Sequence, residues 1–382
     1  METPFPYAQY VSGKQFIGRK TDVTILGNLL SQGEHAAIYE PPKSGKTSLV
    51  QQTLFTLRMN GKSFSVGQFS ALNVRTPEAF LLRLGTTVLR MAAASADEYA
   101  TLVDRYLQGT HFVFDPRAFS ESDQVLSLGW DLDREDVLAL LRMPFRLAAD
   151  RGERMILIVD EFQCLDLLDN PDEILRPLDA VLREQREHRL FVCVFCGSGV
   201  NAMKSLFTSG FLFNRVVERV PLSPVSEREI CEHIQRGFLA SGKVVNQELI
   251  LGACRLFKGN LWYLNHFASI CDARSRGYIM EPLFVEALED LIALHSPRFR
   301  DMVNSLTTHQ VNLLKATLEG VVRFSSADVI RKYGLNSSAN VKRVKDALMK
   351  KEVLLFDEND IPSVVDPLFE YWLKKYYFEM QA

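Results

Sequence analysis

Residues 36–47 read AAIYEPPKSGKT, and this stretch decides which fold the sequence predicts. Residues 36–39 form a short apolar run, which is typical of a buried strand, and the periodicity that begins at Lys46 is helical. A strand, a tight loop and a helix in this order make up one half of a βαβ unit. The stretch therefore predicts a parallel sheet with a loop at the carboxyl end of one strand.

The loop carries the second half of a phosphate-binding pattern. Gly45-Lys46-Thr47 matches the end of G-x-x-x-x-G-K-[ST], in which the loop amides wrap phosphates. The glycine lets the backbone approach the phosphates, the lysine can reach β- and γ-phosphate oxygens, and the threonine hydroxyl can bind Mg²⁺. Glu40 stands where the pattern has its first glycine, and because a carboxylate repels phosphates we expect its side chain to point away from the ligand. The residues of this stretch expected to bind nucleotide are Pro42, Lys43, Ser44, Gly45, Lys46, Thr47 and Ser48.

A second motif supplies carboxylates. Residues 155–159 are apolar and are followed by Asp160-Glu161, and a run that is apolar on both faces fits a parallel sheet covered by helices on each side. Asp160 would hold Mg²⁺ together with Thr47, and Glu161 would orient the attacking water as a general base. An acidic pair by itself could simply begin a loop. Its combination with the phosphate-binding loop upstream favours a nucleotide site.

Another apolar run, residues 190–196, precedes Gly197-Ser198. Ser198 could contact the γ-phosphate or the attacking water, or it could be an ordinary cap between strand and helix. Both readings stay open. Cys193 and Cys196 lie within the same run, which favours buried thiols over a zinc or redox site.

Composition limits the class of protein. The chain has 382 residues, 47% of them hydrophobic and 24% charged, which is typical of a globular protein of about two or three domains. A net charge of −3 argues against a polycation that binds nucleic acid over its whole surface. The first residues lack a signal-peptide pattern and no apolar stretch reaches the ~20 residues that span a bilayer. We therefore expect a cytoplasmic protein with reduced thiols.

Strand and helix patterns alternate over residues 21–222, which predicts an α/β doubly wound domain at residues 1–222. Residues 96–136 interrupt the pattern with ten acids and three bases. This insertion could bind a partner or be a solvated, partly helical elaboration. Helical patterns predict a lid domain at 223–297, and three helices followed by a hairpin predict a winged-helix domain at 298–382.

These motifs together resemble the archaeal-type ATPases, P-loop proteins of the AAA+/STAND class, over nearly the whole chain apart from the insertion. The resemblance rests on the two nucleotide motifs, with Asp160–Gln163 as Walker B, and on the segments 16–19, 213–215, 258–264 and 366–372. It implies a sheet with the P-loop strand at its centre, a helical lid and a C-terminal winged helix, in which ATP binding and hydrolysis switch an assembly.

The resemblance also implies roles for single residues. Gly18 and Arg19 correspond to an entry motif that packs near the adenine. Arg215 corresponds to an arginine finger or sensor that acts on a neighbouring subunit. Leu261 stands where the lid motif usually has proline, which is a departure from the family pattern.

The predicted winged helix carries a basic segment. Residues 326–351 hold seven bases and two acids, and Lys342, Arg343 and Lys345 lie on the helix that would meet the major groove of double-stranded DNA. The acidic hairpin that follows would oppose phosphate binding. A winged helix used for packing or protein contact is therefore the alternative.

The sequence predicts an ATP-binding, Mg²⁺-dependent ATPase that acts as a switch, with four catalytic candidates: Lys46, Glu161, Ser198 and Arg215. Two other functions stay open. Glu40 and Leu261 are consistent with a nucleotide-gated scaffold that turns over rarely. The basic helix is consistent with a DNA-binding regulator whose oligomeric state the nucleotide sets.

Overall fold

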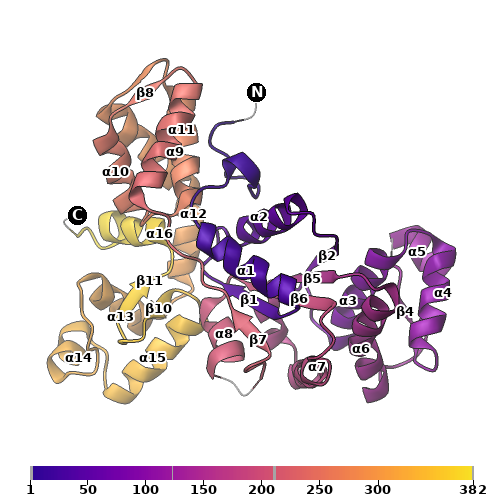
Figure 1. Cartoon of the computed structure of the whole chain (residues 1–382). Helices are drawn as coiled ribbons and strands as arrows, with labels where there is room; N and C mark the ends of the chain where they lie inside the picture. The colour runs from indigo at the N-terminus through magenta and orange to yellow at the C-terminus, as the bar shows by residue number, and fades with distance from the viewer. Residues whose placement is uncertain (1–2, 123, 210–211, 381–382) are drawn as a thin grey trace. The chain divides into compact units, whose positions relative to one another are not determined.

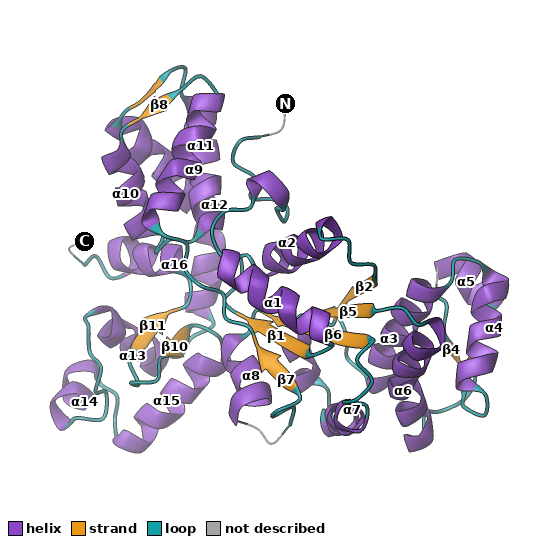
Figure 2. Cartoon of the chain, in the orientation of Figure 1, coloured by secondary structure: helices purple, strands orange, loops and turns teal. Residues whose placement is uncertain are grey.

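The computed structural model describes residues 3–122, 124–209 and 212–380. The chain forms two compact units, and both are discontinuous in sequence. The sheet unit comprises Lys20–Glu40 and Leu49–Leu222, and the helical unit comprises Met1–Arg19, Pro41–Ser48 and Ser223–Ala382. Figures 1 and 2 show the elements of each unit.

A parallel sheet of five strands forms the centre of the sheet unit (Figure 2). Its order is β2 (Ser65–Ser70), β5 (Met155–Asp160), β6 (Phe191–Gly197), β1 (His35–Tyr39) and β7 (Val217–Arg219), and each neighbouring pair is parallel. All residues of β1 and β6 are buried, which explains why both strands read as unbroken apolar runs. The predicted parallel α/β fold is confirmed, but the expectation that the P-loop strand lies at the centre is wrong, since β6 is the central strand and β1 lies between β6 and β7.

Helices flank this sheet and form an appendage at one end of it. Those nearest to the strands in sequence are α1 (Lys20–Gln32), α2 (Lys46–Met59), α3 (Pro77–Ala92), α6 (Arg134–Arg151), α7 (Asp172–Glu184) and α8 (Val200–Lys204). The acidic segment 96–136 forms α4 (Ala96–Leu107), α5 (Pro116–Ser122), a small ladder of β3 (Phe112–Val113) and β4 (Ser127–Leu128), and the start of α6. Tyr99, Val103 and Tyr106 are buried on α4, so the segment is a packed, partly helical elaboration.

In the helical unit, the segment for which the sequence predicts a helical lid contains three helices. These are α9 (Glu227–Ala240), α10 (Gln247–Leu256) and α11 (Leu261–Arg274), and two short strands, β8 (Val244–Val245) and β9 (Tyr278–Ile279), pair in parallel beside them. The N-terminal segment completes their core, because Phe5 is fully buried and its ring contacts the Phe238 ring at 4.7 Å between centroids.

A long helix, α12 (Glu281–Asn304), leads into the winged helix. It runs without a break through residues 297 and 298, where the sequence places a domain boundary. The predicted three helices and hairpin follow as α13 (Thr308–Leu318), α14 (Ala327–Tyr333), α15 (Ser338–Lys350), β10 (Leu354–Phe356) and β11 (Pro362–Val364), and α16 (Pro367–Trp372) packs on them. No helix in the described part of the chain combines the length and apolar character needed to cross a membrane.

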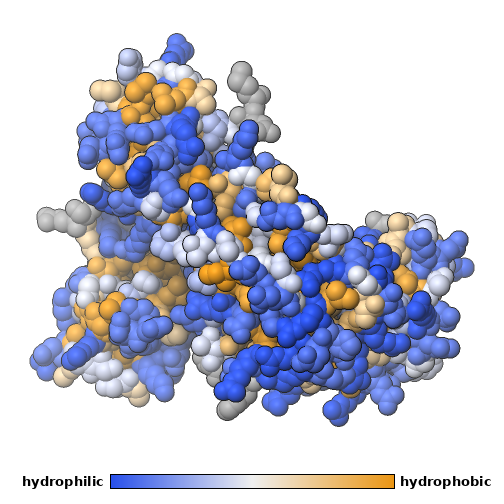
Figure 3. Space-filling view, viewed as in Figure 1, coloured by the Kyte–Doolittle hydropathy of each residue, from blue (hydrophilic) through white to orange (hydrophobic). Residues whose placement is uncertain are grey.

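Exposed apolar side chains gather around β8 and β9 in the helical unit. Val244, Tyr278 and Met280 are each more than half exposed. Figure 3 shows the apolar surface over this part of the unit.

Two glycines of the lid test the packing of the N-terminal segment. A Cβ on Gly237 of α9 would overlap the Phe5 ring, whereas a Cβ on Gly252 of α10 would meet nothing within 4 Å. We expect Gly237→Ala to lower the free energy of unfolding by about 1–3 kcal/mol through overpacking. Gly252→Ala, the matched control, should raise it by about 0.5–1 kcal/mol because alanine favours helix. Urea denaturation measures both, and equal effects of the two substitutions would contradict this packing.

Strand β1 contains a buried histidine that makes stability depend on pH. The Nδ1 atom of His35 accepts a hydrogen bond from the Cys193 amide at 3.0 Å, and burial, opposed by Glu34 and reinforced by Arg189, lowers the pKa of His35 to about 4. Between about pH 4 and 6.5 the unfolded chain therefore binds more protons than the folded one, so stability falls as pH falls through this window.

We expect this histidine to contribute up to about 3 kcal/mol to the loss of stability between pH 6.5 and 4. His35→Asn keeps an acceptor near Nδ1 and does not titrate, so its stability should fall less steeply. His188→Asn, at an exposed position, is the control and should follow the wild type. Denaturation midpoints at several pH values give the slopes, and identical slopes for wild type and His35→Asn would refute the assignment.

Candidate functional site

The loop between β1 and α2 is held by its own backbone and by one lysine. Lys46, at the first position of α2, is buried, and its Nζ donates to the Pro41 carbonyl at 3.0 Å. The Ser44 amide donates to the same carbonyl at 3.3 Å. Lys43 and Gly45 have φ values of +64° and +99°, so the chain makes a tight turn before the helix begins.

The loop offers polar groups that fit a phosphate. The hydroxyl of Ser44 is buried without a hydrogen-bond partner among the described residues, and such groups ordinarily find a ligand or water. Thr47 follows Lys46 at the N-terminus of α2, where unsatisfied backbone amides and the helix dipole favour an anion. The hydroxyl of Ser48 is already engaged, since it accepts a hydrogen bond from the Val11 amide at 3.1 Å.

Arg19 holds the loop against the start of the lid segment. Its Nη1 donates to the Ser44 carbonyl at 2.8 Å and its Nε donates to the Ser223 carbonyl at 2.8 Å. A Cβ on Gly45 would lie 2.7 Å from Arg19 Nη1, and one on Gly18 would lie 2.9 Å from a Val225 methyl group. The sequence assigns Gly18 and Arg19 to the nucleotide, and the structure places Arg19 on the loop backbone.

The predicted carboxylate pair lies in the sheet unit, at the carboxyl end of β5. The Asp160 Oδ1 accepts a hydrogen bond from the Glu161 amide at 3.0 Å. Glu161 has the left-handed backbone conformation, with φ of +52°, which is costly for a residue other than glycine and is common at functional sites. Its carboxylate accepts a hydrogen bond from the Ser198 hydroxyl at 2.6 Å. The structure therefore brings two of the predicted catalytic residues together.

Gln163 is a residue of this site that the sequence does not single out. Its Nε2 donates to the same Glu161 oxygen that Ser198 contacts, and its Oε1 is buried without a partner among the described residues. A glutamine two positions after an acidic pair has no periodicity or motif of its own. Its place in the segment Asp160–Gln163, which resembles the family motif, is its sole signal in the sequence.

Glu40, the departure from the phosphate-binding pattern, faces a cation. Its Oε1 lies 3.6 Å from Nη2 of Arg219, and the Arg219 guanidinium lies 4.5 Å from the centroid of the Tyr39 ring. The Glu40 amide donates to the Gly197 carbonyl at 3.4 Å, which ties the end of β1 to the end of β6. Arg219 thus offsets the negative charge that the sequence places at the entrance of the loop.

Arg215 lies between Phe213 and β7 in an exposed position with φ of +63°. Among the described residues it has no hydrogen bond or ion pair. Phe213 anchors this segment, because its ring is fully buried and its amide donates to Asp179 Oδ1 at 2.7 Å. An anchored backbone that carries an exposed arginine is compatible with contact to a second molecule.

The three candidate DNA-binding residues on the basic helix α15 differ in exposure and in their partners. Lys342 and Arg343 are exposed, and Arg343 donates to Asn340 Oδ1 at 2.9 Å. Lys345 is paired with Asp360 in the hairpin turn and lies 3.8 Å from the centroid of the Phe356 ring. The acid of the hairpin is therefore partly neutralised, and Lys345 is less available to an external ligand than the other two bases.

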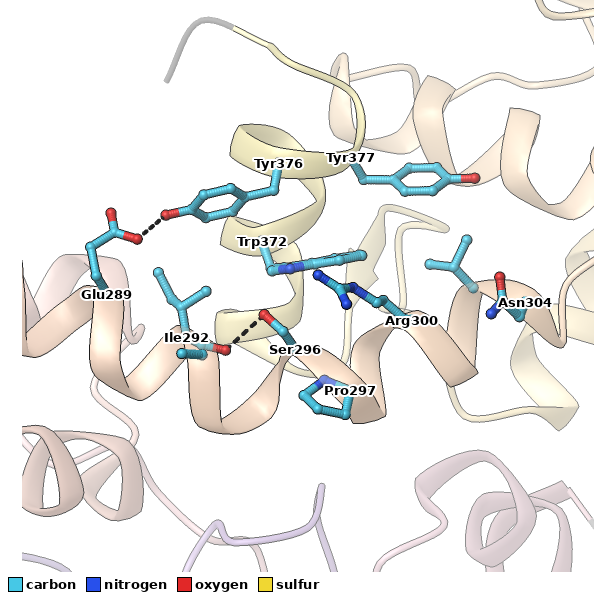
Figure 4. Close-up of a pocket in the computed structure, with 11 residues that line it drawn as sticks. Glu289, Ile292, Ser296, Pro297, Arg300, Asn304, Trp372, Tyr376 and Tyr377 are labelled. Atoms are coloured by element: carbon cyan, nitrogen blue, oxygen red, sulfur yellow. Dashed lines mark hydrogen bonds between the residues drawn. The ribbon is translucent and has the colours of Figure 1, made fainter.

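The helical unit also contains a cavity of about 710 Å³ that lies apart from the loop residues. It lies between α12 and the C-terminal turns, and its walls include Arg300, Trp372 and Tyr377. Figure 4 shows the Arg300 side chain directed toward the Trp372 ring, and Tyr376 bonded to Glu289 at the rim. No residue of the loop 41–48 lines it, so it is separate from the candidate phosphate site.

Comparisons with known proteins agree with this architecture. A family model described as a probable winged helix domain matches residues 297–375, and no curated protein sequence matches the chain. The Walker-type ATPase paby2304 of Pyrococcus abyssi is similar at a TM-score of 0.68 and 15% identity, over 97% of this chain and 99% of that one. The ORC2 protein of Aeropyrum pernix, solved in ADPNP-ADP complexes, is similar at a TM-score of 0.56 and 14% identity, over 95% of this chain and 93% of that one. The chain therefore has the AAA+ P-loop fold followed by a helical region and a C-terminal winged helix.

Proposed function

We propose that this chain, whose fold is that of a Walker-type ATPase, binds ATP at the loop 41–48 and hydrolyses it as a molecular switch of the archaeal-type ATPase family. The observation that carries the proposal is that both nucleotide motifs of the sequence occur, each at the carboxyl-terminal side of a strand of the sheet. Strand β1 leads directly into Gly45-Lys46-Thr47, and the neighbouring ends of β5 and β6 hold Glu161 and Ser198 in a 2.6 Å hydrogen bond. The nucleotide complexes of the similar ORC2 protein support adenine nucleotide as the ligand.

Several groups of the loop bind phosphate in this proposal. The unsatisfied backbone amides at the N-terminus of α2 bind the phosphate, and the Ser44 hydroxyl supplies a further donor. Lys46 exchanges the Pro41 carbonyl for β- and γ-phosphate oxygens, which pair better with an ammonium. Arg19 keeps the loop backbone in place through its hydrogen bond to the Ser44 carbonyl.

Thr47 and Asp160 are the proposed Mg²⁺ ligands, since hydroxyl and carboxylate oxygens suit this hard cation. When bound, the ion neutralises charge on the β- and γ-phosphates. Glu161 orients and polarises the attacking water as a general base, while Ser198 and Gln163 fix its carboxylate. Arg215 is proposed to reach the site of a second copy in an oligomer.

Two substitutions separate binding from hydrolysis. We expect Lys46→Ala to abolish ATP binding and Glu161→Gln to bind ATP normally while hydrolysing it on the order of 10²-fold more slowly or worse. Glu187→Gln, at an exposed position with no role in the site, is the control. Phosphate release and binding of a fluorescent ATP analogue are measured on the same samples. Hydrolysis by Glu161→Gln at the wild-type rate would refute the proposed base.

The same assay distinguishes the nucleotide-gated scaffold. Wild-type protein that binds ATP or ADP tightly and releases no phosphate over many hours would support this function instead. Arg219→Ala tests whether Glu40 disfavours the nucleotide, because it removes the positive charge of Arg219 beside Glu40 and should weaken ATP binding. Arg219→Ala combined with Glu40→Gly should recover that affinity.

DNA binding by the winged helix is a second candidate function, favoured by the exposed bases Lys342 and Arg343 on α15. Charge reversal of both to glutamate should weaken binding of duplex DNA at least 10-fold and reduce the salt slope by about 2. Lys345→Glu should have a smaller effect because Asp360 already pairs with Lys345. Arg276→Glu in the lid is the control. Equal DNA affinity in the double variant and the wild type, measured by fluorescence anisotropy at low salt, would exclude this function.

A further inference from the structure

A second lysine of the phosphate loop makes a contact that phosphate binding does not explain. The Lys43 ammonium lies 3.5 Å from the centroid of the Trp262 ring and 5.7 Å from that of Tyr263. An ammonium over the face of an aromatic ring is attracted by the ring quadrupole, and tryptophan is the best partner. Lys43 therefore rests on the first turn of α11, although as a residue it is exposed.

The aromatic surface beneath Lys43 is preformed. The side chain of Asn260 caps α11 by accepting from the Trp262 and Tyr263 amides at 3.0 and 3.1 Å. Tyr7 contacts the Trp262 ring edge-on at 5.9 Å and stacks on His266 at 4.1 Å. Because the cap fixes the backbone and Tyr7 packs on the ring, Trp262 is held in place to receive a cation.

The same surface leads to the C-terminal segment. The Tyr263 hydroxyl donates to both carboxylate oxygens of Asp366, at 2.8 and 2.9 Å, and Arg298 donates to Asp366 at 2.6 Å. Asp366 also caps α16, accepting from the Leu368 amide at 3.0 Å. A small cavity of about 110 Å³, with Pro42, Lys43, Tyr263, Arg298 and Asp366 among its lining residues, lies between the loop and this cap.

The site holds Lys43 at an electrostatic cost. The pKa of Lys43 is lowered to about 8, mainly by partial burial of its ammonium group and also by Arg298, while Asp366 opposes the change. The charged form is thus less favoured on Trp262 than in water. Phosphate oxygens form charge-assisted hydrogen bonds with ammonium groups, which are stronger than a contact with a ring face. A polyphosphate in the loop would therefore compete well for this lysine.

We propose that Lys43 is a phosphate-released latch, held by Trp262 when the loop carries no polyphosphate and drawn away by the phosphates of a bound nucleoside triphosphate. The release frees the first turn of α11 and, through Tyr263, alters the environment of the Asp366 cap on α16. The release step rests on the proposed ATP binding, whereas the contact itself does not. Because coupling is reciprocal, the latch lowers the affinity of the loop for nucleotide.

The contact is tested without nucleotide in a protein that retains Trp262 as its sole tryptophan, made by Trp130→Phe and Trp372→Phe. We expect Trp262 fluorescence to titrate with a midpoint near pH 8 and the transition to disappear in Lys43→Met, which keeps the length of the side chain. Burial raises the pKa of Tyr263 and lowers the pKa values of His266 and His295, and the pKa of Arg298 is raised, so these neighbours titrate outside this window. A transition that persists in Lys43→Met, or no transition in its parent, would overturn the latch.

The release is tested by ATP affinity in the full chain. Trp262→Leu removes the ring and should bind ATP with Mg²⁺ about 5- to 10-fold more tightly, and Trp262→Phe should fall between Leu and the wild type because phenylalanine is the weaker partner. Lys43→Met should show no gain, since it loses the phosphate contact together with the latch. Trp130→Leu replaces a tryptophan that is 75% exposed in the sheet unit and should leave the affinity unchanged.

The outcomes separate the two proposals. If the wild type binds ATP and both Trp262 variants, with unchanged melting temperatures, bind it no more tightly, the release step is wrong and the proposed function stands. If the wild type binds no ATP, the proposed function fails and the release step fails with it, and the pH titration decides the contact independently. Graded tightening from Trp to Phe to Leu supports the latch, because a structural role of the ring would weaken binding as the fold loosens.

Discussion

The parallel pairing of β1 with β6 on one side and β7 on the other is the constraint on which the rest of the site depends. Parallel strands end at one edge of a sheet, so this pairing places Glu40, Gly197 and Asp160 at the same edge without any long-range recognition between their side chains. Strand β1 is buried along its whole length, and its backbone is paired with β6 from Ala36 to Tyr39 and with β7 from His35 to Ala37. Chemistry at this edge is therefore set first by backbone hydrogen bonds.

The elements that the sequence predicts well are those with a strong local signal. Strands β1, β5 and β6 correspond to the apolar runs in the sequence, and Lys46, Glu161 and Ser198 follow these runs in the chain. The three lid helices and the winged-helix elements follow from periodicity. The structure adds to these predictions the direct hydrogen bond between Ser198 and Glu161.

The elements that the sequence does not predict lack such a signal. Strand β7 has three residues and two of them are exposed, so neither an apolar run nor an alternation marks it, and Arg219 is missed with it. Helix α12 contains Pro297 in its interior. Proline usually indicates the end of a helix, so the sequence does not show that the helix continues past residue 297. The contact of Lys43 with Trp262 joins two segments far apart in the chain, and no pattern in either segment indicates that the two meet. Long-range pairs of this kind depend on the assembled fold.

The burial of Phe5 among the lid helices has a consequence for the order of folding. During synthesis the N-terminal segment emerges first, but its partners on α9 are made only after the whole sheet unit has been synthesised. In the interval the sheet unit can form its strands, while the Phe5 side chain has no core to pack into. Contacts with so large a sequence separation close slowly, so the helical unit is the later of the two to mature. The phosphate loop belongs to that unit, and the bond from Arg19 to the Ser223 carbonyl is the support that must wait for the later part of the chain.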